Sequence, residues 1–457
     1  MEIVMPRIAL PLLNRPVSFN SLLCGTLLLS GCLYNEFEPV ATPTSDVAVE
    51  AQANLAAENP TPSTSQAAAP ATSTAAPTPA LEVPSADGNN QLSAEDVEAG
   101  WIKLFDGHTL FGWQPNSEAE WIVSNGEIQI PEGPKGLLCT TTRFADFELR
   151  CDAWIDTTSN SGIFLRTPLK PTNPAVDCYE LNICDQHPAG FTSGSLVARA
   201  KPSQTVPTAG GWHTYEATVA GPDVTVKLDG QVMATYKDET ANPLKTGFIG
   251  LQQNGGPARF RNIYLKPLGF QSLWNGQDLS GWRVVPGSVG TFEVKEKLLH
   301  VAGGRGFLET ETKADNFILQ FTARTLADNL NGGIFFRAME GTEKAPSHGY
   351  EFQIHNGFKN GDRNQPLDHG TGAIFRRVSA RRIVANDNAW LTGTLIADGP
   401  HFSTWVNGIQ MVDWTDSRQP NVNPREGLRL EAGHISLQGH DPTTQFDFKS
   451  IQLAPLP

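Results

Sequence analysis

The feature that most constrains this sequence is an internal repeat, which covers most of the chain after residue 99. The paired segments occur in the same order in both halves: residues 104–107 with 273–276, 160–166 with 331–337, 228–230 with 406–408, and 250–252 with 436–438. A shared order over such lengths indicates a duplicated domain, and two copies make a tandem pair and not a solenoid. We place the first domain at residues 99–268 and the second at 269–457.

Within each copy the local patterns predict short β-strands. Residues 147–154 and 215–219 alternate apolar and polar side chains, and Asp229-Gly230 and Asn407-Gly408 are typical two-residue hairpin turns. The only helical turn expected lies at residues 93–99, with Ser93 as its cap. The sequence therefore predicts an all-β fold with two tandem β-sandwiches.

One strand in each copy combines an apolar face with a polar face. In Tyr350-Glu351-Phe352-Gln353-Ile354-His355, alternation places Glu351, Gln353 and His355 on one side. The first copy has the same pattern in Tyr179-Glu180-Leu181-Asn182-Ile183. An acid and an amide on one strand face predict a polar groove in each sandwich.

The N-terminus resembles a bacterial lipoprotein signal peptide. Arg7 and Arg15 precede an apolar stretch that ends in Leu29-Ser30-Gly31-Cys32. The resemblance implies removal of residues 1–31, lipidation of Cys32 and, because Leu33 follows, anchoring in the outer membrane. An ordinary secretory signal and a short membrane anchor are the alternatives, although the apolar run is too short to span a bilayer.

Residues 32–98 are expected to form a disordered linker, because most of this stretch consists of Ala, Pro, Thr and Ser with few apolar side chains. The formal net charge of the chain is −14. An acidic balance argues against nucleic acid and anionic lipid surfaces as partners. Contact with a membrane is expected only through the lipid on Cys32.

Several motifs, most of which recur in both copies, resemble the 3-keto-disaccharide hydrolase domains, also described as 3-keto-glucoside lyase and 2-hydroxy-glucal hydratase domains. The motifs are the Leu-Phe-Asp-Gly…Gly-Trp opening at residues 104–113, residues 160–166, the Tyr-Glu-x-Gln-Ile strand, and residues 247–252 with 260–263. The resemblance covers nearly all of residues 100–457. It implies a concanavalin A-like jelly-roll sandwich and an enzyme that cleaves 3-keto-glucosides or 3-keto-disaccharides by hydrolysis or by lyase-hydratase chemistry.

For such a substrate, the ketone acidifies the proton at C2, a base removes it, an electrophile holds the enolate, and the group at C1 leaves. The candidate catalytic residues are Glu351, His355, Arg337, His440 and Glu180. The candidate substrate-binding residues are Gln353, His369, Trp390, Arg166 and Asn182. A His and Glu set could also hold a divalent metal, although no HxH or HExxH pattern is present.

Other readings of the same residues stay open. A polar strand face is most often simply solvated, and Arg337 could brace a carboxylate within its sheet. The second copy is expected to be the more active, because the first has Cys184 in place of His355 and Asn254 in place of His440. A non-catalytic glycan-binding lipoprotein is the alternative function, since lectins share this fold; a purely structural surface protein is a third.

Four cysteines belong to the first copy: Cys139, Cys151, Cys178 and Cys184. An oxidising location outside the cytoplasm permits disulfides, and the three ways of pairing four cysteines stay open. A straight strand between Cys178 and Cys184 would keep these two apart. The spacing of the four matches no common zinc site.

Overall fold

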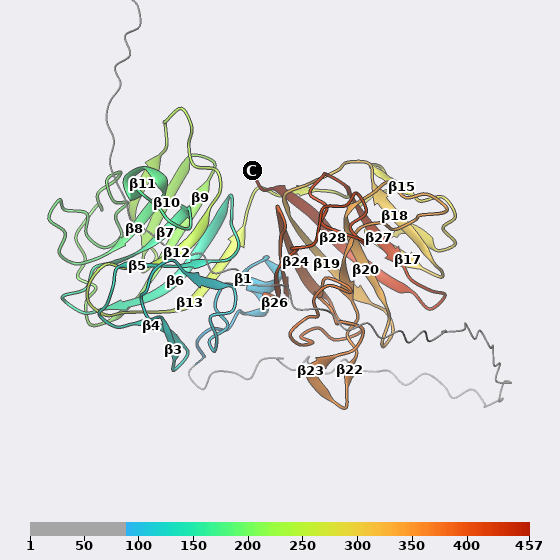
Figure 1. Cartoon of the computed structure of the whole chain (residues 1–457), viewed down its shortest axis with the longest axis horizontal. Helices are drawn as coiled ribbons and strands as arrows, with labels where there is room; N and C mark the ends of the chain where they lie inside the picture. Colours follow the sequence, from blue (N-terminus) through green and yellow to red (C-terminus); the bar gives the residue numbers. More distant parts are fainter. Residues whose placement is uncertain (1–87) are drawn as a thin grey trace, which may run out of the picture. The chain divides into compact units, whose positions relative to one another are not determined.

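A computed structural model describes residues 88–457 of the chain (Figure 1). The predicted signal peptide, the lipidation of Cys32 and most of the predicted linker lie outside the described residues. No helix within residues 88–457 is long and apolar enough to cross a membrane.

The first repeat forms two antiparallel sheets. The order of the eight-stranded sheet is β11-β10-β9-β6-β13-β4-β3, with β1 beside β13, and that of the five-stranded sheet is β2-β5-β12-β7-β8. The larger sheet contains β1 (Ile102–Lys103), β3 (Ile122–Ser124), β4 (Glu127–Ile130), β6 (Phe147–Ile155), β9 (Trp212–Ala220), β10 (Asp223–Leu228), β11 (Gln231–Lys237) and β13 (Ala258–Pro267). The smaller sheet contains β2 (Trp113–Pro115), β5 (Gly136–Thr140), β7 (Ser161–Thr167), β8 (Tyr179–Ile183) and β12 (Phe248–Gln253).

The second repeat has the same plan, with sheet orders β16-β17-β28-β19-β24-β25-β26 (β14 beside β28) and β15-β18-β27-β20-β21. Its larger sheet contains β14 (Gln271–Ser272), β16 (Thr291–Lys295), β17 (Leu298–Ala302), β19 (Phe317–Thr325), β24 (Leu391–Asp398), β25 (His401–Val406), β26 (Ile409–Thr415) and β28 (Gln445–Pro455). Its smaller sheet contains β15 (Trp282–Val284), β18 (Gly306–Thr310), β20 (Gly332–Ala338), β21 (Tyr350–Ile354) and β27 (His434–Gly439). A separate hairpin joins β22 (Phe358–Lys359) to β23 (Asp362–Pro366). The prediction of an all-β chain with two tandem jelly-roll sandwiches is confirmed.

The predicted hairpin turns are also confirmed. Asp229 and Gly230 join β10 to β11, and Asn407 and Gly408 join β25 to β26. All four residues have positive φ, between 49° and 78°. A turn of this kind requires positive φ at both central positions, which asparagine, aspartate and glycine tolerate best.

The predicted helical turn is present as α1 (Ala94–Glu98), where the Ser93 side chain accepts a hydrogen bond from the backbone of Asp96. A second helix, α2 (Pro174–Asp177), precedes β8. The predicted linker extends too far, because Asn90 is buried and exchanges hydrogen bonds with Asn262 of the first sandwich, at 2.6 and 2.8 Å. Part of the expected disordered segment therefore belongs to the folded domain.

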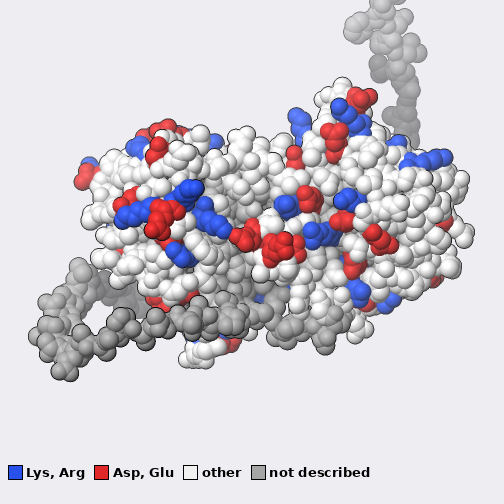
Figure 2. Space-filling view, turned by 180° about the vertical axis from the view of Figure 1, so that it is seen from behind, with Lys and Arg blue, Asp and Glu red and all other residues white. Residues whose placement is uncertain are grey.

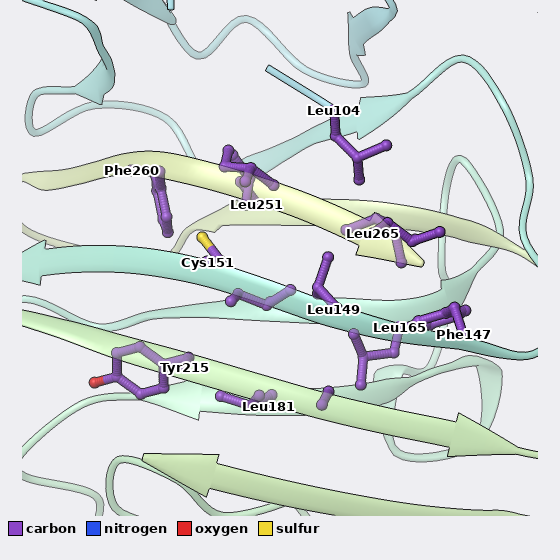
Figure 3. Close-up of a cluster of buried hydrophobic side chains, with 14 of the residues drawn as sticks. Leu104, Phe147, Leu149, Cys151, Leu165, Leu181, Tyr215, Leu251, Phe260 and Leu265 are labelled. Carbon is purple, nitrogen blue, oxygen red and sulfur yellow. The ribbon is translucent and has the colours of Figure 1, made fainter. Parts of the chain in front are cut away.

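The core of each repeat lies between its two sheets. Along β6 the side chains alternate between buried and half-buried, so Leu149 and Cys151 enter the first core. Figure 3 shows them beside Phe260 and Leu265 of β13 and Tyr215 of β9. Burying a side chain of about the size of leucine contributes about 1.5–3 kcal/mol. Because buried positions alternate along all nine residues of β6, these contributions fix which face of the strand points toward the core.

The four cysteines in residues 88–457 are buried and free, so none of the disulfides considered above forms. Burial raises the pKa of the Cys139 thiol to about 12 and raises those of Cys151, Cys178 and Cys184 as well. A buried thiol that resists ionisation is a poor nucleophile and a poor metal ligand. These side chains therefore serve as small apolar packing groups.

Candidate functional site

The polar strand face of the second repeat lies on the outer side of its five-stranded sheet. On β21, Tyr350 and Phe352 enter the core, whereas Glu351 and Gln353 point away from it. Glu351 is paired across the sheet with Phe335 of β20, and Gln353 with Gly333. The predicted division of this strand into two faces is therefore present.

Above this face lies a cavity of about 550 Å³. Its volume is in the range of small-molecule binding sites. Its polar lining includes Glu351, Gln353 and His440, which were candidates from the sequence, together with Asn331, Ser347, Gln438, Arg305, Arg376, Arg377 and Arg425. Phe307 and Phe375 supply aromatic walls. The cavity thus combines one acid, several amides and hydroxyls, aromatic rings and a group of arginines.

Gly333 makes room for the acid. A Cβ atom at this position would lie 2.8 Å from Oε1 of Glu351 and 2.9 Å from the carbonyl oxygen of Phe352. Real Cβ atoms do not approach other atoms so closely, so any larger residue would displace the carboxyl group. The position of Glu351 therefore explains why Gly333, the second glycine of the Asn331-Gly332-Gly333 motif, is a glycine.

Glu351 is only 7% exposed, and burial raises its pKa to about 8. Arg425 and Arg376 act in the opposite direction, since their positive charges favour the carboxylate, while Asp368 reinforces the effect of burial. At neutral pH the neutral carboxylic acid is the main form. A carboxyl group whose pKa lies near the working pH can both accept and donate a proton in one catalytic cycle.

Gln353 is held by a small hydrogen-bond network. Its Nε2 donates to Oδ1 of Asn331 at 3.2 Å and to Oδ2 of Asp368 at 3.0 Å. Its Oε1 is buried and has no partner among the described residues, and the same is true of Oε1 of Gln438. Two fixed, unpaired acceptors beside one cavity suit ligands that carry hydroxyl groups.

The arginines of the cavity were not among the candidates from the sequence. Nη2 of Arg425 donates to Oγ of Ser347 at 3.1 Å, and its guanidinium lies 5.6 Å from the ring centre of Phe335. Arg377 donates to the backbone carbonyls of both Arg376 and Arg425, and so ties together the loops that carry them. Strand alternation could not reveal these arginines, because it describes only the strands. The adjacent pair Arg376-Arg377, directly after a buried segment, was the sequence signal that could have found them.

Arg337 and Arg166, by contrast, do not line this cavity. Arg337 is fully buried, and its guanidinium donates to the carbonyls of Asp315, Gly399 and Arg429 at 2.6–3.0 Å. A register shift after Phe335 and a φ of 45° at Arg337 interrupt the alternation that placed it on the cavity face. Arg166 has the same role in the first repeat, with a φ of 50° and bonds to the carbonyls of Ala145, Gly221 and Leu244.

The imidazoles do not gather around Glu351 as expected. His440 lines the cavity and contacts Asp441, with 2.9 Å between Nδ1 and Oδ2. His355 bonds instead to the carbonyl of Leu330, and His369 bonds to Ser379 and packs against the edge of Phe375. Only one imidazole is therefore available at the cavity wall. The expected aromatic platform is also elsewhere: Trp390 lies beside Arg324 on the outer face of the eight-stranded sheet.

Comparison with known families decides where the chain belongs. The model of one family, described as the 3-keto-alpha-glucoside-1,2-lyase-like domain, matches residues 100–266 and again residues 269–454. The chain belongs to this family. The two matches coincide with the two sandwiches, so each repeat is a 3-keto-alpha-glucoside-1,2-lyase-like domain and the resemblance seen in the sequence is confirmed.

Solved structures are similar to part of this chain. A candidate glycosyl hydrolase from Parabacteroides distasonis is 20% identical over 39% of this chain and 99% of that chain, with a TM-score of 0.36. A second such protein from the same organism is 23% identical over 37% and 99% of the two chains, with a TM-score of 0.31. The carbohydrate-binding module CBM66 from Bacillus subtilis is 14% identical over 34% and 95%, with a TM-score of 0.28. Among curated proteins, none matches the chain.

The first lyase-like domain carries the equivalent acid on β8. Glu180 is buried, burial raises its pKa to about 7, and Nε2 of Gln252 donates to it at 3.1 Å. Asn182 corresponds to Gln353 and donates to the carbonyl of Phe191. The acid and the amide of this strand thus occupy the same strand positions as Glu351 and Gln353 of β21.

The surroundings of Glu180 differ from those of Glu351. The residue before β8 is Cys178, whereas the residue before β21 is Gly349, which lines the cavity. Cys178 packs with Leu137, Cys139 and Phe164 in an apolar cluster. Ala198 is the equivalent of Arg376. The β-bridge of Leu196 with Ala200 in the first repeat matches that of Ile374 with Val378 in the second, and the two residues lie at the same position within these turns. The first domain therefore has an acid without the adjacent arginine of the second domain.

A metal site is not evident in this lyase-like pair. Within residues 88–457, no three His, Cys, Asp or Glu side chains converge in a way that could hold a metal ion. The acids and the imidazole nearest the cavity, Glu351, Asp368 and His440, are not such a group.

Proposed function

We propose that the second repeat cleaves 3-keto-glucosides by elimination between C1 and C2, followed by hydration of the resulting glucal. The family to which the chain belongs is a family of carbohydrate-active domains, which supports a sugar ligand. The observation that carries the proposal is Glu351: a buried acid with a pKa of about 8, facing a cavity and subject to the charge of Arg425. These are the properties of a group that moves a proton at a carbon next to a ketone.

The elimination can be written with these side chains. The carboxylate of Glu351 removes the proton from C2, and the electrons of the C–H bond enter an enolate whose negative charge lies on the C3 oxygen. Arg425 stabilises that oxygen. The enolate then reforms the ketone, a double bond forms between C1 and C2, and the bond from C1 to the leaving oxygen breaks. Glu351 returns its proton to that oxygen, so the products are an alcohol and a 2-hydroxy-3-keto-glucal.

The remaining polar groups of the cavity would position the sugar. The free Oε1 atoms of Gln353 and Gln438 can each accept a hydrogen bond from a hydroxyl group. Phe307 and Phe375 offer apolar surface to the faces of the sugar ring. Addition of water to C1 and C2 of the glucal then gives 3-ketoglucose, so the sum of the two steps is hydrolysis.

Turnover in heavy water tests this order of events. If the mature protein converts a 3-keto-disaccharide through a glucal, the 3-ketoglucose formed in D₂O carries deuterium at C2, because hydration delivers a solvent proton there. Direct hydrolysis would leave the original hydrogen at C2, and mass spectrometry with NMR distinguishes the two products. Glycan binding without turnover would favour a non-catalytic glycan-binding protein instead. A parallel incubation of free 3-ketoglucose corrects for exchange after release.

For the first repeat we infer a supporting or glycan-binding role. Glu180 has a raised pKa like Glu351, but Cys178 and Ala198 replace the glycine and the arginine found beside Glu351. The acid is thus present, but the glycine and the arginine found beside Glu351 are not. This difference supports the second repeat as the catalytic one.

We also propose that the protein is exported and anchored by a lipid on Cys32, at the periplasmic or outer-membrane surface. The support is the Leu29-Ser30-Gly31-Cys32 motif after a basic and apolar N-terminus. Replacing Cys32 with alanine is expected to abolish incorporation of labelled palmitate and to shift the protein out of the membrane fraction. Label on the Cys32→Ala protein would contradict this assignment.

A further inference from the structure

Three arginines of the cavity carry positive charge without an acidic partner. Among the described ion pairs, several other arginines of the second repeat are matched with carboxylates, including Arg283 with Glu309, Arg324 with Asp447, and Arg418 with Asp416. On the face shown in Figure 2, basic and acidic side chains likewise lie next to one another. Arg305, Arg376 and Arg425, by contrast, form no ion pair within residues 88–457, although all three line one cavity.

The neighbouring acids do not neutralise this charge. Among residues 88–457, Glu351 is the only Asp or Glu that lines the cavity, and at neutral pH its raised pKa keeps it mostly protonated. Burial is the main cause that lowers the pKa of Arg425, and although Glu351 raises that pKa, the like charges of Arg376 and Arg305 lower it further. In a chain whose net charge is −14, a cavity with this local excess of positive charge requires an explanation.

The proposed elimination uses only one of the three. A single guanidinium at the enolate oxygen accounts for Arg425, which also contacts Ser347. Arg305 and Arg376 have no side-chain hydrogen bond to any described residue, and both are exposed enough to meet a ligand that enters the cavity. Their guanidinium groups are therefore free to form paired hydrogen bonds with an oxyanion.

We propose that the substrates of this cavity are anionic glycosides, and that Arg305 and Arg376 bind a carboxylate, sulfate or phosphate group on the substrate. This inference rests on the proposed function of the same site, because it identifies which 3-keto-glucosides the site prefers. The anionic group would lie on the part of the substrate away from the reacting carbon, since Arg425 and Glu351 occupy the chemical centre. Arg377 is a positioning residue, because it bonds to the backbone on which Arg376 and Arg425 stand.

The first repeat supplies the matched comparison. Lys135 stands directly before β5, as Arg305 stands directly before β18, and Ala198 stands where Arg376 does. The backbone is nearly the same at the second position, with a φ of 59° at Ala198 and 57° at Arg376. An alanine is thus already tolerated in this turn. Arg376→Ala should fold, and so should Arg305→Ala, since the Arg305 side chain bonds to no described residue.

The experiment compares neutral and anionic substrates on the mature full-length protein. The probes are phenyl 3-keto-α-glucoside and its para-carboxylate and para-sulfate derivatives, with kcat/KM measured for the unchanged protein, Arg305→Ala, Arg376→Ala and the double variant. We expect a preference for an anionic probe at low ionic strength and a loss of about tenfold in that preference for each arginine removed. Salt at about 1 M should reduce the preference as well. Lys135→Ala, the matched control, should keep it.

The outcomes separate this inference from the proposed function. Equal kcat/KM for neutral and anionic probes in the unchanged protein would overturn the inference, and so would a preference that survives in the double variant. The anionic probe with the higher kcat/KM shows whether the arginines prefer a carboxylate or a sulfate group. If no keto-glycoside is turned over, the proposed reaction is wrong. Calorimetric binding of the parent glycosides without the ketone, with and without the para-carboxylate, then still decides whether the two arginines select an anion.

Discussion

Replacing Glu351 with glutamine should lower kcat/KM for a 3-keto-disaccharide by a factor of about 10²–10⁴, the usual contribution of a general base. Glutamine resembles the neutral acid in shape and charge, and the neutral acid is the main form of Glu351 at pH 7, since its pKa is about 8. The variant should therefore fold normally and lose only the ability to take a proton. Glu180→Gln, at the same strand position of the first repeat, is the control and should change kcat/KM less than about threefold. The measurement is release of 3-ketoglucose at fixed pH.

The pH dependence supplies the second readout for the same residue. A base must be ionised to act, so kcat/KM should rise with pH through the pKa of Glu351 and level off above about 8. The opposite slope would assign Glu351 as an acid that must be protonated at the start. In Glu351→Gln the residual rate should lose this dependence. If Glu180→Gln caused the large loss and Glu351→Gln did not, the catalytic assignment of the two repeats would be reversed.

The fold was predictable because its signals are local and repeated. Hydrophobic alternation in residues 147–154 and the Asp229-Gly230 and Asn407-Gly408 turns each fix one element. The position of Glu351 and Gln353 followed from the same alternation on β21. Strand periodicity thus reveals which side chains leave the core, and in this chain that was enough to find the acid of the cavity.

The rest of the site depends on features that periodicity cannot describe. Arg305, Arg376 and Arg425 stand outside the regular strands, and only the tertiary fold brings these loops to one cavity. Alternation was misleading at Arg337, because the bulge after Phe335 adds a residue and turns the side chain away from the cavity. Comparison of the two copies offered one clue, since Arg376 is replaced by Ala198 in an otherwise similar turn.

Replacing Arg337 with methionine should destabilise the second repeat by roughly 3–5 kcal/mol, because several buried hydrogen bonds are lost. The guanidinium is fully buried, and it donates to the carbonyls of Asp315, Gly399 and Arg429 and to the side chain of Asn316. Methionine can fill much of the volume but cannot donate a hydrogen bond, so several buried acceptors would lose their partner, at a cost of about 1–3 kcal/mol each. For a domain of this size, differential scanning calorimetry should show the midpoint of one unfolding transition falling by about 6–20 °C.

Two further variants decide whether Arg337 is structural or catalytic. Arg305→Met removes an exposed arginine of the same repeat that bonds to no described side chain, and should leave both melting transitions within about 1 °C, since surface substitutions of this kind change stability by less than about 0.5 kcal/mol. Arg166→Met should lower the transition of the first repeat, because Arg166 bonds to the carbonyls of Ala145, Gly221 and Leu244 in the same way. A loss of turnover in Arg337→Met with unchanged melting would contradict this account. It would return Arg337 to the catalytic role that strand alternation alone had predicted, because a bracing arginine cannot be removed without a cost in stability.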